Sequence, residues 1–154
     1  MLTPFKLLTI VFVVFISFSA QAFRLTPMVE EFYPGKKSSR TKTFTLVNEG
    51  GSPAALEVEI LSRGQDENGK EVRSSTEDFI VYPPQLEIKG GEKRNLRVSY
   101  VGDKTLKREK AYRLVVRQLP VNLKKKSGED RNTKINFVFE YVASLYVKPS
   151  NDVR

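Results

Sequence analysis

Apolar and polar residues alternate along most of this chain, and this period of two is the feature that most restricts its fold. The segments 41–48, 55–61 and 95–100 each place an apolar side chain at every second position. Because successive side chains of a β-strand point to opposite faces, the alternation predicts strands with one face on a core and one in water. Turn-forming residues separate the segments: Pro34-Gly35, Glu49-Gly50-Gly51-Ser52-Pro53, Asn68-Gly69, Pro83-Pro84, Gly90-Gly91 and Ser127-Gly128.

The pattern predicts seven strands, and no segment shows a helical period or an internal repeat. Seven short strands with regular turns predict an all-β, immunoglobulin-like sandwich of two sheets. The sequence contains neither cysteine nor tryptophan, so the disulfide and the buried tryptophan of antibody domains are absent and a sandwich of another lineage is expected. The expected strands are near 23–33, 41–48, 55–63, 77–82, 94–100, 110–118 and 134–147.

The first 22 residues have the three parts of a secretory signal peptide. Lys6 supplies the positive charge, an apolar run extends from Leu7 to Phe18, and Ala20-Gln21-Ala22 offers small residues for cleavage. A membrane anchor is the alternative, but this run is shorter than the roughly 20 residues that a spanning helix needs. We therefore predict cleavage after Ala22, one domain over residues 23–149, and a C-terminal tail over 150–154.

The composition argues against an enzyme. Histidine and cysteine are both absent, which removes the commonest general base, nucleophile partner and metal ligand. The pairs Glu30-Glu31 and Glu77-Asp78 fall at turns or strand ends and read as solvated charges. The net charge is +8, and +7 once Lys6 is removed with the signal peptide. Export and scattered charges argue against nucleic-acid binding, and the run Lys124 to Lys126 is expected to be a solvated loop.

The last expected strand is unusually long and apolar. Its odd-numbered face carries Ile135, Phe137, Phe139 and Tyr141, followed by Ala143 and Leu145. One interpretation is a central strand that packs this larger face on the core. The other is a strand whose first half lies at a sheet edge and is offered to a protein that lacks a strand, with backbone hydrogen bonds giving affinity and alternate side chains giving specificity.

Five segments of the sequence form a recognisable series. In order they are Phe44-Thr-Leu-Val-Asn48, Asp78-Phe-Ile-Val-Tyr-Pro-Pro84, Gly90-Gly91 with Leu96-Arg97-Val98, Glu109-Lys-Ala-Tyr-Arg-Leu114 with Leu119-Pro120, and Leu145-Tyr-Val-Lys-Pro149. In this order they resemble the N-terminal domain of periplasmic pilus chaperones, the PapD-like family. The resemblance extends from Phe23 to Pro149, behind the expected signal peptide.

The resemblance implies a periplasmic protein that needs no cofactor and assists pilus assembly. Its partners would be pilus or fimbrial subunits with an incomplete immunoglobulin-like fold, bound by donation of the last strand, and an outer-membrane usher. Neither nucleic acid nor stable membrane insertion after signal cleavage is expected. The residues matching the donor positions are Ile135, Phe137 and Phe139, with Tyr141 continuing the row, and Glu109 and Lys148 match an ion pair of the family. The alternative is a secreted or periplasmic structural or adhesive accessory protein without chaperone activity.

Two departures from the family pattern are visible. The family binds the terminal carboxylate of a subunit with two basic residues, whose positions here fall on or near Glu30 and on Ser144, so this anchor does not carry over. Family members also continue into a second sandwich after the Lys-Pro segment. We therefore expect an atypical, single-domain relative.

Overall fold

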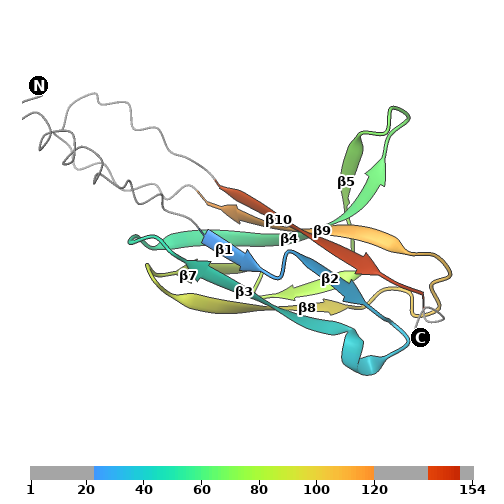
Figure 1. Cartoon of the computed structure of the whole chain (residues 1–154), viewed down its shortest axis with the longest axis horizontal. Coiled ribbons are helices and arrows are strands. Elements are labelled where there is room, and N and C mark those ends of the chain that lie inside the picture. Colours follow the sequence, from blue (N-terminus) through green and yellow to red (C-terminus); the bar gives the residue numbers. More distant parts are fainter. Residues whose placement is uncertain (1–22, 120–138, 150–154) are drawn as a thin grey trace, which may run out of the picture.

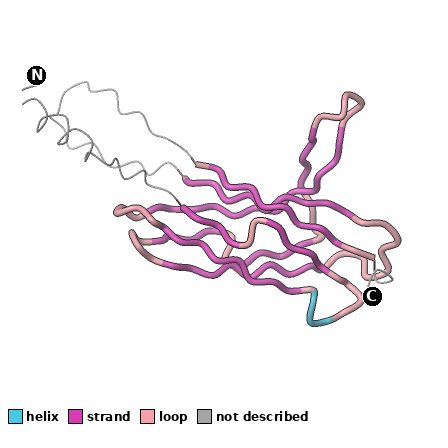
Figure 2. The backbone as a smooth tube through the Cα atoms, viewed as in Figure 1, coloured by secondary structure: helices cyan, strands magenta, loops and turns pink. Residues whose placement is uncertain are grey.

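Alternating apolar residues pack two β-sheets against each other in residues 23–119 and 139–149, the parts of the chain that the computed structural model describes (Figures 1 and 2). The four-stranded sheet has the order β1-β3-β8-β6, and the six-stranded sheet has the order β2-β10-β9-β4-β5, with β7 paired to β4. A single 3-10 turn, η1 (Lys37–Ser39), interrupts the described strands. The strands are β1 (Phe23–Thr26), β2 (Val29–Phe32), β3 (Thr41–Asn48), β4 (Ala54–Gln65), β5 (Glu71–Ser75), β6 (Phe79–Tyr82), β7 (Gln85–Ile88), β8 (Lys93–Tyr100), β9 (Lys110–Gln118) and β10 (Glu140–Val147).

The core lies between the sheets and contains the apolar series that the alternation marks. Phe44 and Leu46 of β3 are fully buried, and on the neighbouring strand β8 Leu96 lies opposite Phe44 and Val98 is also fully buried. The six-stranded sheet contributes a matching layer from β4, β9 and β10, again at every second position. The predicted immunoglobulin-like sandwich is therefore confirmed. The members of this second layer are Leu56, Val58, Ile60, Tyr112, Leu114, Val116, Ala143, Leu145 and Val147.

Phe79 joins the two sheets through aromatic contacts. Its ring lies edge-on to Phe32, Tyr100 and Tyr112, with centroid separations of 5.1, 5.1 and 4.9 Å. Edge-to-face pairs of this kind add stabilisation beyond the area that they bury. The phenolic hydroxyl of Tyr112 donates to the carboxylate of the adjacent Asp78 at 2.5 Å. Burial, and then this hydrogen bond, raise the pKa of Tyr112 well above its ordinary range.

Asn48 is the buried polar residue that fixes two turns at one end of the sandwich. Its side-chain amide donates to Ser52 O at 2.8 Å and to Ile88 O at 3.2 Å, and its Oδ1 accepts from Gly50 N at 3.0 Å. The two turns lie so close together that a Cβ added to Gly90 would stand 2.5 Å from the carbonyl oxygen of Gly51. Glycine at position 90 is therefore required by the close approach of two backbones.

The structure divides the expected strands more finely than the sequence pattern does. The expected strand at 23–33 leaves the four-stranded sheet after Thr26 and joins the six-stranded sheet at Val29, as β1 and β2. Two short strands, β5 and β7, were not expected. The residues 134–138 of the last expected strand lie outside the described residues. The described ranges contain no helix long and apolar enough to cross a membrane.

Candidate functional site

The candidate site is one edge of β10, the strand singled out by the sequence. On one side, β9 pairs antiparallel with the whole of β10. On the other side, β2 pairs in parallel with Ser144–Val147 alone. The amide of Ser144 donates to Met28 O at 2.8 Å, and the amide of Lys148 donates to Phe32 O at 2.9 Å. The residues 140–143 therefore form an open edge, opposite which no strand of the described chain lies.

The alternation of the backbone identifies which groups this open edge presents. The N–H and C=O of one strand residue point to the same side, and those of the next residue point to the other side. The amide of Ser144 faces β2, so the backbone groups of Val142 and Glu140 face the same way. In agreement, the carbonyl of Phe139 faces β9 and accepts from the amide of Gln118 at 3.0 Å. The backbone N–H and C=O groups of Glu140 and Val142 therefore point toward the position that an added strand would occupy.

Apolar side chains lie at this edge. Phe139 is 40% exposed, and Tyr141 is partly buried against the core. Met28 and Val29, where β2 begins, are 47% and 57% exposed. Of the four predicted donor residues, the structure therefore describes Phe139 and Tyr141, and both lie next to the open edge. Ile135 and Phe137 lie outside the described residues.

The other predicted pair, Glu109 and Lys148, lies beyond the opposite end of β10. Lys148 Nζ is 2.6 Å from Glu109 Oε2 and 3.5 Å from Glu31 Oε1. The Glu109 carboxylate, followed by that of Glu31, raises the pKa of Lys148. A hydrogen bond from the Tyr33 hydroxyl at 2.6 Å, assisted by the charge of Lys148, lowers the pKa of Glu31. These contacts tie the C-terminal end of β10 to β2 and to the start of β9.

The two positions where the family has basic residues each have a basic neighbour from another strand. Lys42 Nζ lies 2.6 Å from Glu30 Oε1 and neutralises that carboxylate. Arg113 Nη1 donates to Ser144 Oγ at 2.5 Å. Neither contact was expected from the sequence, because Lys42 reaches Glu30 from the other sheet, and Arg113 lies opposite Ser144 through the pairing of β9 with β10.

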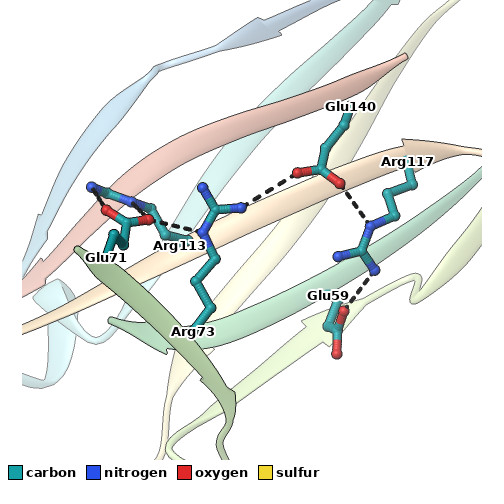
Figure 3. Close-up of polar contacts among 6 residues, drawn as sticks. All are labelled: Glu59, Glu71, Arg73, Arg113, Arg117 and Glu140. Atoms are coloured by element: carbon teal, nitrogen blue, oxygen red, sulfur yellow. Dashed lines mark hydrogen bonds and ion pairs between the residues drawn. The ribbon is translucent and has the colours of Figure 1, made fainter. Parts of the chain in front are cut away.

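A network of arginines and glutamates covers the outer face of the six-stranded sheet (Figure 3). Glu71 of β5 lies at its first centre, where Arg113 reaches the carboxylate with Nε at 3.2 Å and Nη2 at 2.7 Å. Arg63 and Arg73 each contact the same carboxylate at 2.8 Å. Hydrogen bonds from Arg113, and then from Arg73, hold the pKa of Glu71 far below its ordinary value.

Glu140, the first residue of β10, is the second centre of the network. Its Oε2 lies 2.9 Å from Arg117 Nε, and its Oε1 lies 3.3 Å from Arg73 Nη1. Arg117 continues to Glu59 of β4 at 3.0 Å. Beneath these groups Val115 is fully buried on the outer side of the sheet, although it is no part of the core between the sheets. No local sequence pattern indicates this network, because its members come from four strands.

The geometry supports recognition of a polypeptide rather than chemistry on a small molecule. The open edge offers backbone hydrogen-bonding groups beside apolar side chains, which is the arrangement required for strand addition. In the described residues, histidines, cysteines and carboxylates form no group of three that could hold a metal ion.

Comparisons with known proteins agree with this reading of the fold. The model of a family described as pili and flagellar-assembly chaperone, PapD N-terminal domain, matches residues 33–152. Comparison with curated protein sequences gave no match.

Several solved structures share the fold. The complex of the CsuC chaperone with the CsuE tip adhesion subunit from Acinetobacter baumannii Csu pili matches with a TM-score of 0.64 and 22% identity, over 83% of this chain and 57% of that one. The Salmonella enterica SafA pilin in complex with the SafB chaperone gives a TM-score of 0.60 and 17% identity, over 86% and 57% of the two chains. The E. coli chaperone DraB gives a TM-score of 0.57 and 22% identity, over 84% and 55%. The chain thus spans a little over half the length of each of these structures.

Proposed function

The chain belongs to the family of pili and flagellar-assembly chaperones with a PapD N-terminal domain, and we propose that it binds pilus subunits by strand addition at the open edge of β10. Pilus chaperones of this family are periplasmic and are not enzymes. The proposal adds to this a mechanism, a partner and a surface. The partner is a pilus or fimbrial subunit whose immunoglobulin-like fold lacks a strand, and an outer-membrane usher is proposed as the second partner.

The observation that carries the proposal is the incomplete pairing of β10. Residues 140–143 have β9 on one side and no described strand on the other. Exposed edges with apolar side chains are a liability that proteins normally cover or charge. Here the edge continues toward Phe139, and Phe137 and Ile135 occupy the preceding alternate positions of the sequence. A subunit that lacks a strand would cover this edge and would itself be protected from aggregation.

Solved structures among those that match support the choice of partner. One contains a chaperone with a tip adhesion subunit, and another contains a chaperone with a pilin. Because the sequence identity of these structures to the chain is low, the similarity shows only the fold. The assignment of such a partner to this chain therefore rests on the open edge and on family membership.

Removing one backbone donor at the open edge tests strand addition directly. The amide of Val142 faces the open edge and not β9, so Val142→Pro deletes a donor that pairs with no strand of the described chain. We expect the variant to fold, and its affinity for a pilin-type subunit of the same genome to fall at least about tenfold, since a lost bond and a backbone clash act together. The measurement is co-purification after periplasmic co-expression, followed by titration with the purified subunit.

The matched control is Val142→Ala, which keeps the amide and shortens the side chain. Its affinity should stay within about threefold of the native value, because the outer-face side chain is not the bonding group. A folded Val142→Pro protein that binds the subunit as tightly as the native chain would refute addition at this edge. If neither the native protein nor the two variants bind such a subunit, the role of a structural or adhesive accessory protein is favoured instead.

A further inference from the structure

The first half of β10 has less support than the second. Over Ser144–Val147 the strand lies between β9 and β2, but at Glu140 and Val142 β9 is its only neighbour among the described strands. A strand flanked on one side loses half of the backbone hydrogen bonds that would hold it extended, and such segments open most easily. The edge that the proposed partner needs is therefore the part of the strand that most needs another restraint.

Glu140 supplies side-chain contacts at this point. Its two carboxylate oxygens are divided between Arg117 of β9 at 2.9 Å and Arg73 of β5 at 3.3 Å (Figure 3). We name these two contacts the Glu140 clamp. The side chains of all three residues are roughly 34–40% exposed, so each ion pair alone is weak in water. The two ion pairs matter because of their position: they connect the beginning of β10 to β9 and to β5.

The contact with Arg73 spans the sheet. In the strand order, β5 is separated from β10 by β9 and β4, which in a flat sheet would place the two strands about 14 Å apart. The contact forms because the β4–β5 hairpin protrudes from the sheet, as Figure 1 shows. Arg73 is itself fixed, since Glu71 binds it at 2.8 Å and is held in turn by Arg113. The hairpin thus carries an anchored arginine to the beginning of β10.

We propose that the Glu140 clamp positions the open edge of β10 for its partner, and that the β4–β5 hairpin is part of the binding device through Arg73. Glu140 is then a positioning residue: its side chain holds the outer face while its backbone groups face the incoming strand. A strand that is already extended needs less ordering when it binds, which favours association. This inference rests on the proposed function for its biological purpose, but its physical content can be measured in the free protein.

Amide hydrogen exchange of the mature protein, with Glu140→Gln compared to the native chain, tests the clamp. The amide of Tyr141 lies beside the clamp and faces β9, whereas the amide of Leu145 lies where β2 also covers the strand. Loss of the clamp should make Tyr141 exchange about two- to fivefold faster, the range expected for weak exposed ion pairs. Leu145 should exchange at the native rate.

Two further variants separate positioning from a general loss of charge. Glu49→Gln removes a comparable exposed ion pair with Arg24, at 3.1 Å, and should leave Tyr141 unchanged. Arg73→Gln removes one of the two contacts of the clamp, so it should raise the Tyr141 exchange rate by less than Glu140→Gln does. The double variant should add little to Glu140→Gln, which already removes the contact with Arg73. An unchanged Tyr141 rate in Glu140→Gln, or a uniform rise that includes Leu145, would overturn the proposal.

Failure of the proposed function would look different. If the amides exchange as expected but the native protein binds no pilin-type subunit, strand addition is contradicted. The proposal about the Glu140 clamp is then still supported. If both hold, Glu140→Gln should slow the association of the subunit more than it speeds dissociation, because the bound strand is held by its new partner.

Discussion

Single residues hold the turns of this sandwich, and Asn48 is the clearest case. It ends β3, is almost fully buried, and satisfies three backbone groups from two different turns. A buried polar group is tolerated where its hydrogen bonds are complete, and it becomes costly when a partner is removed. The sequence singled out Asn48 only as the end of a motif, since the carbonyl of Ile88 lies 40 positions away.

Asn48→Ala should therefore lower the free energy of unfolding by about 2–3 kcal/mol, because two carbonyls and one amide lose their partner inside the protein. The measurement is urea unfolding followed by circular dichroism. Asn95→Ala is the control: its Oδ1 accepts from Thr45 Oγ1 at 3.2 Å on the exposed face, and its loss should cost no more than about 0.5 kcal/mol. Equal effects of the two substitutions would show that burial of Asn48 is not what matters.

At the scale of elements, the outer face of the six-stranded sheet depends on the protruding β4–β5 hairpin. Glu71 enters the arginine network from that hairpin, and three arginines surround its carboxylate. Because those arginines stabilise the ionised form, the pKa of Glu71 is lower in the folded chain than in the unfolded chain. The hairpin is therefore held in place by a charge that acid can remove.

The sign of the resulting pH dependence follows from linkage. A carboxyl group with a lowered pKa in the folded state contributes stability above its unfolded pKa, and that contribution is lost as the pH falls below it. The native chain should thus lose stability more steeply below about pH 4.5 than Glu71→Gln does. Unfolding in urea at pH 7, 5, 4 and 3 measures this difference, and parallel curves for the two proteins would contradict it.

How far the elements follow from sequence depends on whether a strand faces the core. The limits of β9 agree with the strand predicted at 110–118, because apolar side chains occupy every second position from Tyr112 to Val116. The residues of β5 are Glu-Val-Arg-Ser-Ser, all at least partly exposed, so no alternation marks them, although Asn68-Gly69 did predict the turn before it. The strand β7 has four residues between a proline turn and Lys89, too few for a period to show.

The candidate site divides in the same way. Alternation indicates that Phe139, Tyr141 and Ala143 share a face, because this follows from the strand itself. It does not indicate where β2 stops covering β10, nor that Arg73 reaches Glu140, since the two partners are 67 positions apart. Those contacts depend on how strands are arranged around the sheet. A pattern confined to one segment contains no information about them.

At the scale of the whole molecule, the described chain presents an uncovered strand edge beside the exposed ring of Phe139. Without a subunit, another copy of the chain is the nearest available strand, and edges of this kind pair with one another. We therefore expect concentration-dependent self-association of the mature protein, measured by sedimentation velocity from about 1 to 100 μM, the range in which exposed strand edges associate.

Phe139→Glu should weaken that association without unfolding the domain, because the side chain is already 40% exposed and a charge at an edge opposes pairing. Ile80→Glu is the control, since this residue is also exposed but lies on β6 of the other sheet. It should leave the association unchanged. If association persists in Phe139→Glu but disappears in Ile80→Glu, the contact involves the four-stranded sheet and the prediction is wrong.

The crossing of the chain from β1 to β2 determines the length of the open edge of β10. Residues 27–28 carry the chain from one sheet to the other, and pairing with β10 begins directly afterwards, at Val29 opposite Ser144. A crossing two residues later would uncover β10 as far as Leu145 and lengthen the free edge by roughly 7 Å. A crossing two residues earlier would shorten the free edge by the same length. Relatives with insertions or deletions at this crossing should therefore differ in how long a segment they can accept, even where the residues of β10 are the same.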